Sequence, residues 1–169
     1  MPRTKKKTPP APPTAGIREL MWVDPKTLSE NPMNWRKHPN RQKDAIGASI
    51  KANGWADTLL FNENTGRLID GHARREVAIR DGIDSVPVLV GSWTEEQEKH
   101  LLATLDPMAA MAETDAKALT SLTDMIRDDR EAFAELEEKD QEILETVNEE
   151  LETYACLLYT SDAADEEDS

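Results

Sequence analysis

The chain has 169 residues, of which 34 are acidic and 20 are basic, so its formal net charge at pH 7 is −14. This length fits one domain with tails. The sequence has no run of about 18 apolar residues, which a membrane-spanning helix needs, and no secretory signal, so a cytoplasmic protein is expected. The single cysteine, Cys156, excludes an internal disulfide bond.

Residues 1–19 are expected to form a disordered tail that is basic and proline-rich. Three lysines at residues 5–7 precede a stretch, residues 9–13, in which four of the five residues are proline. Because proline disrupts helices and sheet ladders, and few of these side chains can be buried, no packed structure is predicted here. The lysines could contact nucleic-acid phosphates, although a solvated leader is the simpler interpretation.

Short strands and helices are predicted over residues 20–112, which we take as the folded domain. Apolar β-branched runs indicate strands, apolar residues at helical spacing indicate helices, and glycine or proline marks the boundaries. In chain order the predicted elements are a strand over 20–23, a loop over 31–39, a helix over 41–52, strands over 58–61 and 67–70, a helix over 72–81, a strand over 85–90 and a helix over 95–105. The two middle strands flank a short turn, which predicts a hairpin.

Four residues set the predicted boundaries of these elements. Asn40 is the candidate cap of the first helix. Pro87 lacks an N–H group, which favours an edge strand or a place at the start of a strand. Thr94 begins a capping box for the last helix, and Pro107 is expected to end that helix.

Residues 113–155 are predicted to form an acidic helical extension. Residues 113–169 hold four basic and twenty acidic side chains, so most of the negative charge of the chain lies here. Apolar residues recur in two stripes, and the remaining faces are mostly acidic. This pattern predicts one or two exposed helices that pack weakly or against something missing from the chain.

The strongest chemical signal is the segment Ile69–Ala78, in which Gly71 follows a strand and opens a helix. The first turn of such a helix points unpaired N–H groups and the positive end of its dipole outward, so an anion can bind there. Arg74 and Arg75 add guanidinium groups that fork onto phosphate oxygens, and His72 can exchange protons near neutral pH. The segment therefore predicts a solvent-facing phosphate site, in which glycine lets the ligand approach the backbone.

The order of the motifs resembles the N-terminal domain of ParB proteins, in the superfamily that also includes sulfiredoxin. The resemblance rests on Asp24-Pro25, Leu28, Asn31-Pro32, Gly54, Thr65–Arg74, Gly82 and Val86-Pro87-Val88, in this order. It implies a compact α/β domain, here an α+β arrangement with a mixed sheet and packed helices, followed by the acidic extension. It also implies that Gly71, His72, Arg74 and Arg75 contact the phosphates of a nucleotide, such as a nucleoside triphosphate with Mg²⁺.

Three departures limit what this resemblance implies. His72 occupies the position of the sulfiredoxin cysteine, so sulfiredoxin activity is not expected. Partition ParB proteins carry a Glu-Asn-x-Gln-Arg segment for the triphosphate and metal, whereas this chain has Leu105–Ala112 in that region. Their helix-turn-helix region is not visible either, so centromere binding is not expected.

The stretch Leu101–Ala112 is similar to ParB-like domains that precede DNA methyltransferases in phages and mobile elements. The resemblance implies an accessory module that binds nucleotide or DNA, with a methyltransferase as a fused or separate partner. No methyltransferase active-site motif occurs in the chain itself. Residues 156–169 resemble one reading frame of a sequencing adapter, so we expect an artefactual tail; a genuine flexible tail is the alternative.

Two other functions remain open. Asp70 and His72 are candidate catalytic residues of a nuclease or phosphotransferase that also uses Arg74. The simpler interpretations are a helix cap for Asp70, a structural histidine at position 72 and surface ion pairs for the arginines. The acidic helical arm could instead be a protein-interaction module.

A basic loop supplies the candidate DNA-binding residues. Arg36, Lys37 and Arg41 lie around Trp35. This mixture suits phosphate contact and base stacking, whereas the alternative is that the tryptophan fills the core. Histidines without a neighbouring cysteine or carboxylate cluster do not match zinc spacing, so no metal site is predicted from protein ligands.

Overall fold

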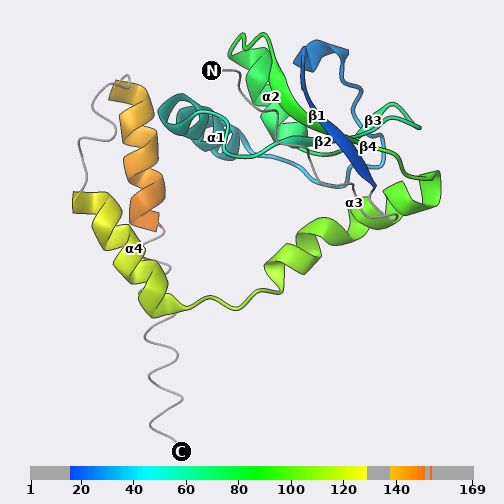
Figure 1. The fold of residues 1–169 in the computed structure, drawn as a ribbon. Coiled ribbons are helices and arrows are strands. Elements are labelled where there is room, and N and C mark those ends of the chain that lie inside the picture. The colour runs from blue at the N-terminus through cyan, green and yellow to red at the C-terminus, as the bar shows by residue number, and fades with distance from the viewer. Residues whose placement is uncertain (1–15, 129–137, 151–152, 154–169) are drawn as a thin grey trace, which may run out of the picture.

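The computed structural model describes residues 16–128, 138–150 and 153 (Figure 1). Its elements are β1 (Ile17–Val23), the 3₁₀ turn η1 (Pro25–Thr27), α1 (Asn40–Asn53), β2 (Leu59–Asn62), β3 (Arg67–Asp70), α2 (His72–Arg80), β4 (Val86–Gly91), α3 (Glu95–Ala110) and α4 (Ala116–Asp128). Residues 138–150 are also helical. The predicted structure of residues 1–15 and the adapter-like segment 156–169 lie outside the described residues.

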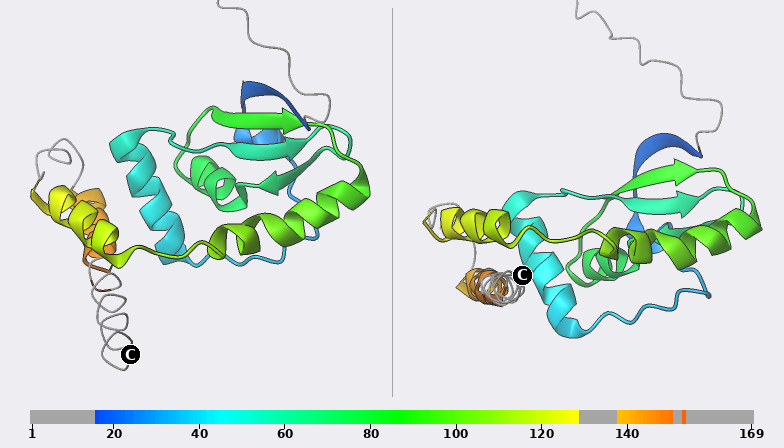
Figure 2. Two further views of the ribbon diagram at one scale, coloured as in Figure 1. Left: turned by 60° about the horizontal axis from the view of Figure 1, so that its bottom comes forward. Right: turned by 90° about the horizontal axis from the view of Figure 1, so that it is seen from below.

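The four strands form one mixed sheet in the order β1-β4-β2-β3. β4 runs antiparallel to β1 and parallel to β2, while β2 and β3 form the predicted antiparallel hairpin. Figure 2 shows α2 packed beneath the strands with α1 beside it. The predicted α+β class with a mixed sheet and packed helices is therefore confirmed.

The core lies between this sheet and α2. Alternate residues of β4 face it, because successive side chains of a strand point to opposite faces. The buried core residues are Leu28, Leu59, Leu68, Ala78, Val86, Val88 and Val90. This packing fixes the turn between β3 and α2 against β2.

Two predicted boundaries near the N-terminal half were wrong. β1 begins at Ile17, so residues 17–19, which we assigned to the tail, belong to a strand, because they pair with the end of β4. α1 begins at Asn40 itself, and the preceding Pro39 is its N-cap residue. The Lys43 N–H group donates to the Pro39 carbonyl at 3.2 Å, so backbone contacts rather than the Asn40 side chain begin this helix.

The predictions about proline had mixed outcomes. The edge-strand alternative for Pro87 was wrong, because β4 has β1 on one side and β2 on the other. Pro87 is the second residue of β4 and pairing with β2 begins only at Val88, which agrees with the alternative that it lies at the start of a strand. Pro107 does not end α3, which continues to Ala110, although the predicted capping box at Thr94 is present. The last turn of α3 is exposed, so water can satisfy the carbonyl that proline leaves without a donor.

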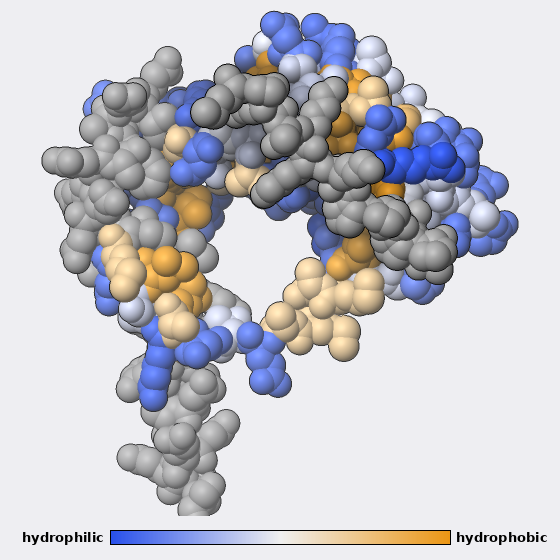
Figure 3. All heavy atoms as spheres, in the orientation of Figure 1, coloured by the Kyte–Doolittle hydropathy of each residue, from blue (hydrophilic) through white to orange (hydrophobic). Residues whose placement is uncertain are grey.

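Within the described residues of the extension, α4 and residues 138–150 are helical. Figures 1 and 2 show α4 beside the helical residues 138–150. Several apolar side chains stay exposed here, among them Met111 at 79% and Met125 at 65% (Figure 3). Within the described residues, no helix has an apolar stretch long enough for a lipid bilayer.

Candidate phosphate-binding site

The turn from β3 to α2 depends on glycine at position 71. Gly71 is the N-cap residue of α2 and has φ of +88°, which side-chain-bearing residues rarely adopt. A Cβ atom at this position would lie 2.7 Å from Cγ of Leu59, so the glycine also allows α2 to pack against β2. No side chain caps α2, which shows that the alternative of Asp70 as the cap was wrong.

Arg74 lies in the first turn of α2 and is held by three acceptors. Its guanidinium donates to the Thr58 carbonyl at 2.9 Å, pairs with Asp70 at 2.9 Å, and pairs with Asp57 at 2.8 Å. The Nε atom is buried and has no hydrogen-bond partner among the described residues. An unpaired buried donor costs about 1–3 kcal/mol, so an acceptor that reached this Nε would stabilise the guanidinium.

A cavity of about 310 Å³ lies directly beside Arg74. One wall is the α1 face with Ile46 and Ile50, and the other is the loop with Trp55 and Asp57. The cavity is thus mainly apolar, with one arginine and one carboxylate at its rim. This combination suits a ligand that has a flat apolar part and an anionic group.

Arg75 points elsewhere, although it is adjacent to Arg74 in the sequence. Its guanidinium donates to the Pro25 carbonyl at 3.0 Å and to Glu30 at 2.7 Å, and it does not line the cavity. Successive helix residues are about 100° apart around the axis, so two adjacent arginines seldom reach one ligand atom. The structure therefore does not bring the two predicted phosphate-binding arginines together.

His72 is 6% exposed, and its Nε2 atom accepts a hydrogen bond from the Asn31 backbone N–H at 3.4 Å. Burial lowers the pKa of His72, outweighing the opposite effects of Asp70 and Glu30. Because Gly71 and Ala73 are buried as well, the expectation that this first turn faces solvent was wrong. Asp70 contacts Arg74, whereas His72 does not line the cavity.

A buried carboxylate that the sequence did not reveal, Glu98, is linked to His72 through Asn31. Glu98 of α3 is fully buried and accepts hydrogen bonds from Asn31 at 2.8 Å, from Asn62 at 2.7 Å and from the Thr65 hydroxyl. Desolvation raises the pKa of Glu98, but these three hydrogen bonds outweigh it and the net pKa is lowered. Because Asn31 also contacts His72, the network joins α3 to the start of α2.

The predicted DNA-binding residues lie away from the cavity. Arg36 pairs with Asp106 of α3 at 2.6 Å and lies over the Trp35 ring, while Lys37 is exposed and Arg41 pairs with Glu150. Trp35 is 59% exposed and donates from Nε1 to the Leu102 carbonyl. The alternative that Trp35 fills the core was therefore wrong.

Among the residues that the structure describes, no group of three or more His, Cys, Asp or Glu side chains is arranged to hold a metal ion.

Comparison with known proteins gives one close sequence relative. No family model matches the chain. Over 72 residues the chain is 38% identical to the ParB-like nuclease domain-containing protein YnaK of Escherichia coli strain K12, which covers 43% of this chain and 82% of that protein.

Solved structures share the fold at low sequence identity. The C-terminally truncated chromosome-partitioning protein ParB from Caulobacter crescentus, complexed with CTP-gamma-S, aligns with a TM-score of 0.54 and 16% identity, covering 64% of this chain and 63% of that one. The chain therefore spans less than two thirds of that ParB. Sulfiredoxin from Arabidopsis thaliana aligns with a TM-score of 0.43 and 17% identity, covering 50% of this chain and 98% of sulfiredoxin.

Proposed function

The chain belongs to the family of ParB-like nuclease-domain proteins, and from this membership we propose that its domain binds a nucleotide or nucleic-acid phosphate at Arg74. The observation that carries the proposal is the unpaired, buried Nε of this arginine beside a cavity of about 310 Å³. A guanidinium with an unused donor is a natural receptor for phosphate oxygens.

Ligand binding requires one exchange of partners at Arg74. Of the acceptors that hold Arg74, a ligand displaces Asp57 most easily. The Asp57 side chain is 67% exposed and lies on a loop, whereas the Thr58 carbonyl belongs to the backbone. A phosphate in place of this carboxylate keeps the guanidinium charge paired.

The apolar walls of the cavity define the rest of the ligand. Ile46, Ile50 and Trp55 offer surfaces for a base or a sugar, while Arg74 holds the phosphate. We take CTP as the first probe, since the ParB neighbour was solved with a CTP analogue. The described residues offer no three-ligand metal cluster, so the triphosphate and water would hold most of any Mg²⁺ that accompanies the nucleotide.

Isothermal titration calorimetry with CTP and Mg²⁺ tests this assignment. Arg74→Ala should abolish the binding heat. Arg75→Ala is the matched control, because it removes the same charge one residue along but outside the cavity. Equal heats for the wild type and Arg74→Ala would contradict the proposal, provided that thermal unfolding shows both proteins folded.

The wider context is a DNA-modification system. We propose that the domain is the N-terminal accessory module of a phage or mobile-element protein, with a DNA methyltransferase as its fused or separate partner. The support is the similarity of Leu101–Ala112 to domains that precede such enzymes. The genomic sequence beyond codon 155 tests it, because a continuation without methyltransferase motifs, and without a neighbouring methyltransferase gene, would count against it.

A nuclease or phosphotransferase is the second candidate function. The E. coli relative is named for a ParB-like nuclease domain. In this chain, Asp70 is a half-exposed carboxylate beside Arg74. His72 would have to act from a buried position with a lowered pKa, which favours a neutral base. Plasmid nicking with Mg²⁺ should be lost in Asp70→Ala and His72→Ala, and equal nicking by all three proteins would end this hypothesis.

A protein-interaction role for the acidic arm is the third candidate. Its support is the set of exposed apolar side chains on α4 and at the end of α3, which include Leu122 at 55% and Met108 at 54%. Deletion of residues 113–155 without loss of any partner would remove this idea.

A further inference from the structure

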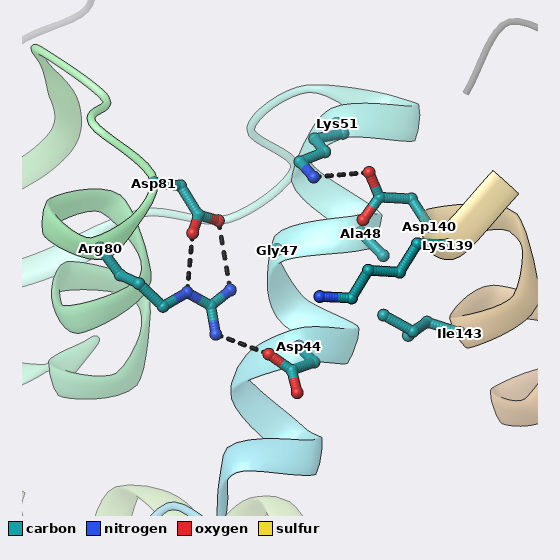
Figure 4. A pocket seen from close by; sticks show the side chains of 9 residues that line it. All are labelled: Asp44, Gly47, Ala48, Lys51, Arg80, Asp81, Lys139, Asp140 and Ile143. Carbon is teal, nitrogen blue, oxygen red and sulfur yellow. Dashed lines mark hydrogen bonds and ion pairs between the residues drawn. The ribbon is translucent and has the colours of Figure 1, made fainter. Parts of the chain in front are cut away.

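The helical residues 138–150 lie beside α1, and most of the side chains that line the cavity between them are charged. Six of these thirteen residues are acidic and one is basic. Figure 4 shows side chains from this helix and from α1 that point toward one another across a shared cavity of about 290 Å³. The acidic extension therefore touches the domain through charged groups.

Two ion pairs join the acidic helix to α1 at matching intervals. Arg41 pairs with Glu150, and Lys51 pairs with Asp140 at 2.5 Å (Figure 4). The two cations on α1 are ten residues apart, and so are the two carboxylates on the acidic helix, which corresponds to about 15 Å along each helix axis. The helices thus run antiparallel, with cations and carboxylates in register.

The two ion pairs differ in exposure, because the Asp140 side chain is 6% exposed whereas Glu150 lies in solvent. The Arg41 and Glu150 side chains are 64% and 56% exposed, so their attraction is screened by water and salt. Between the pairs lies the cavity, lined by groups such as Asp44 and Lys139 rather than by a continuous apolar seam. A competing polyanion could therefore displace the acidic helix.

We propose that the α1 face with Arg41 and Lys51 binds a nucleic-acid backbone, and that the helix 138–150 occupies this face within the same chain. Two cations about 15 Å apart can contact two separate phosphates of one DNA strand. Carboxylates at the same interval imitate those phosphates, so the extension competes with DNA. This inference rests on the DNA-binding part of the proposed function and adds the surface and its internal competitor.

DNA binding by fluorescence anisotropy tests the inference, with the full chain and a labelled 20-base-pair duplex at low salt. The released variant is Asp140→Asn with Glu150→Gln, which removes the charge of the two helix carboxylates that pair with Arg41 and Lys51. The matched control is Glu145→Gln with Glu149→Gln, which changes the net charge equally on the same helix, and these side chains have no ion pair with α1 in the described structure.

The released variant should bind DNA more tightly than the control by roughly 2- to 30-fold, the gain expected from two surface ion pairs. Its binding should also fall more steeply with salt, by about 1.8 in the log–log slope, because two more phosphates are contacted. Adding Arg41→Gln and Lys51→Gln to the released variant should abolish the gain.

Equal tightening in the released variant and the control would overturn the inference, because general repulsion by net charge would then explain it. Failure of all these proteins to bind DNA would also overturn it. The calorimetric test with CTP at Arg74 is independent of either outcome, so failure of the α1 surface and failure of the phosphate site can be told apart.

Discussion

Replacement of Glu98 by glutamine should destabilise the domain more than any other single exchange of one acid for its amide. The carboxylate is fully buried and accepts from Asn31 and Asn62, with Thr65 as a third donor. Glutamine offers one acceptor oxygen where glutamate offers two, and it places a new donor against an existing donor.

The expected cost follows from these contacts. A hydrogen bond to a charged group contributes about 1.5–3 kcal/mol, and a stranded buried donor costs about 1–3 kcal/mol. Asn62 keeps a second acceptor in the Trp93 carbonyl, which limits the damage on that side. We therefore expect Glu98→Gln to lower the free energy of unfolding by about 2–4 kcal/mol.

Urea unfolding followed by circular dichroism measures this loss, with Glu95→Gln as the control. Glu95 lies in the same helix turn but is exposed, so its change should stay within about 0.5 kcal/mol. A loss below about 1 kcal/mol for Glu98→Gln would refute the reasoning, since at least one buried donor would then face the new NH₂ group without that cost.

The dependence on pH gives an independent check of the same residue. The pKa of Glu98 is lowered in the folded protein, so the ionised form stabilises the fold above the ordinary value of about 4.3. This contribution is lost as pH falls through the lowered pKa. The difference between wild type and Glu98→Gln should therefore be largest at neutral pH and narrow in acid.

Three further predictions concern the turn and the cavity. Asp57→Asn should tighten CTP binding roughly 1.4- to 5-fold by calorimetry, because the ligand no longer competes with an exposed ion pair to Arg74 worth about 0.2–1 kcal/mol; unchanged affinity would contradict this. Burial lowers the pKa of His72, so the wild type should lose stability as pH falls below about 6.5, and His72→Gln should flatten that part of the stability curve. Gly71→Ala should lower the stability measured by thermal unfolding more than Gly82→Ala does. Both substitutions place alanine at positive φ, which costs about 1–2 kcal/mol, but only the one at Gly71 also brings Cβ to 2.7 Å from the Leu59 side chain.

The sequence predicted the parts of the site that depend on neighbours along the chain. The strand, the glycine and the helix around Gly71 follow from local backbone preference and apolar spacing, and all three are present. The capping box at Thr94 is likewise a contact between residues three apart. Local signals of this kind are readable because the interacting groups are only a few residues apart.

Sequence reasoning failed where the environment of a side chain depends on distant segments. His72 was expected at the surface, but it is buried, and the backbone N–H of Asn31, 41 residues earlier in the chain, donates to its ring. Glu98 gave no signal at all, because the partners of this buried carboxylate come from two distant segments, the loop at Asn31 and the hairpin with Asn62 and Thr65. Burial and charge pairing are properties of the packed chain, which a single stretch does not carry.

By itself the sequence determined the order of strands and helices and the arginine-bearing helix start, since backbone preference and apolar periodicity act over a few residues. The resemblance to ParB-type domains came from its motifs and their order. Tertiary structure alone decided that Arg74 borders a cavity while Arg75 turns away, and that carboxylates of the acidic helix lie against Arg41 and Lys51. The physical reason is that electrostatic and packing partners are chosen by proximity in space, which appears only when distant segments of the chain come together.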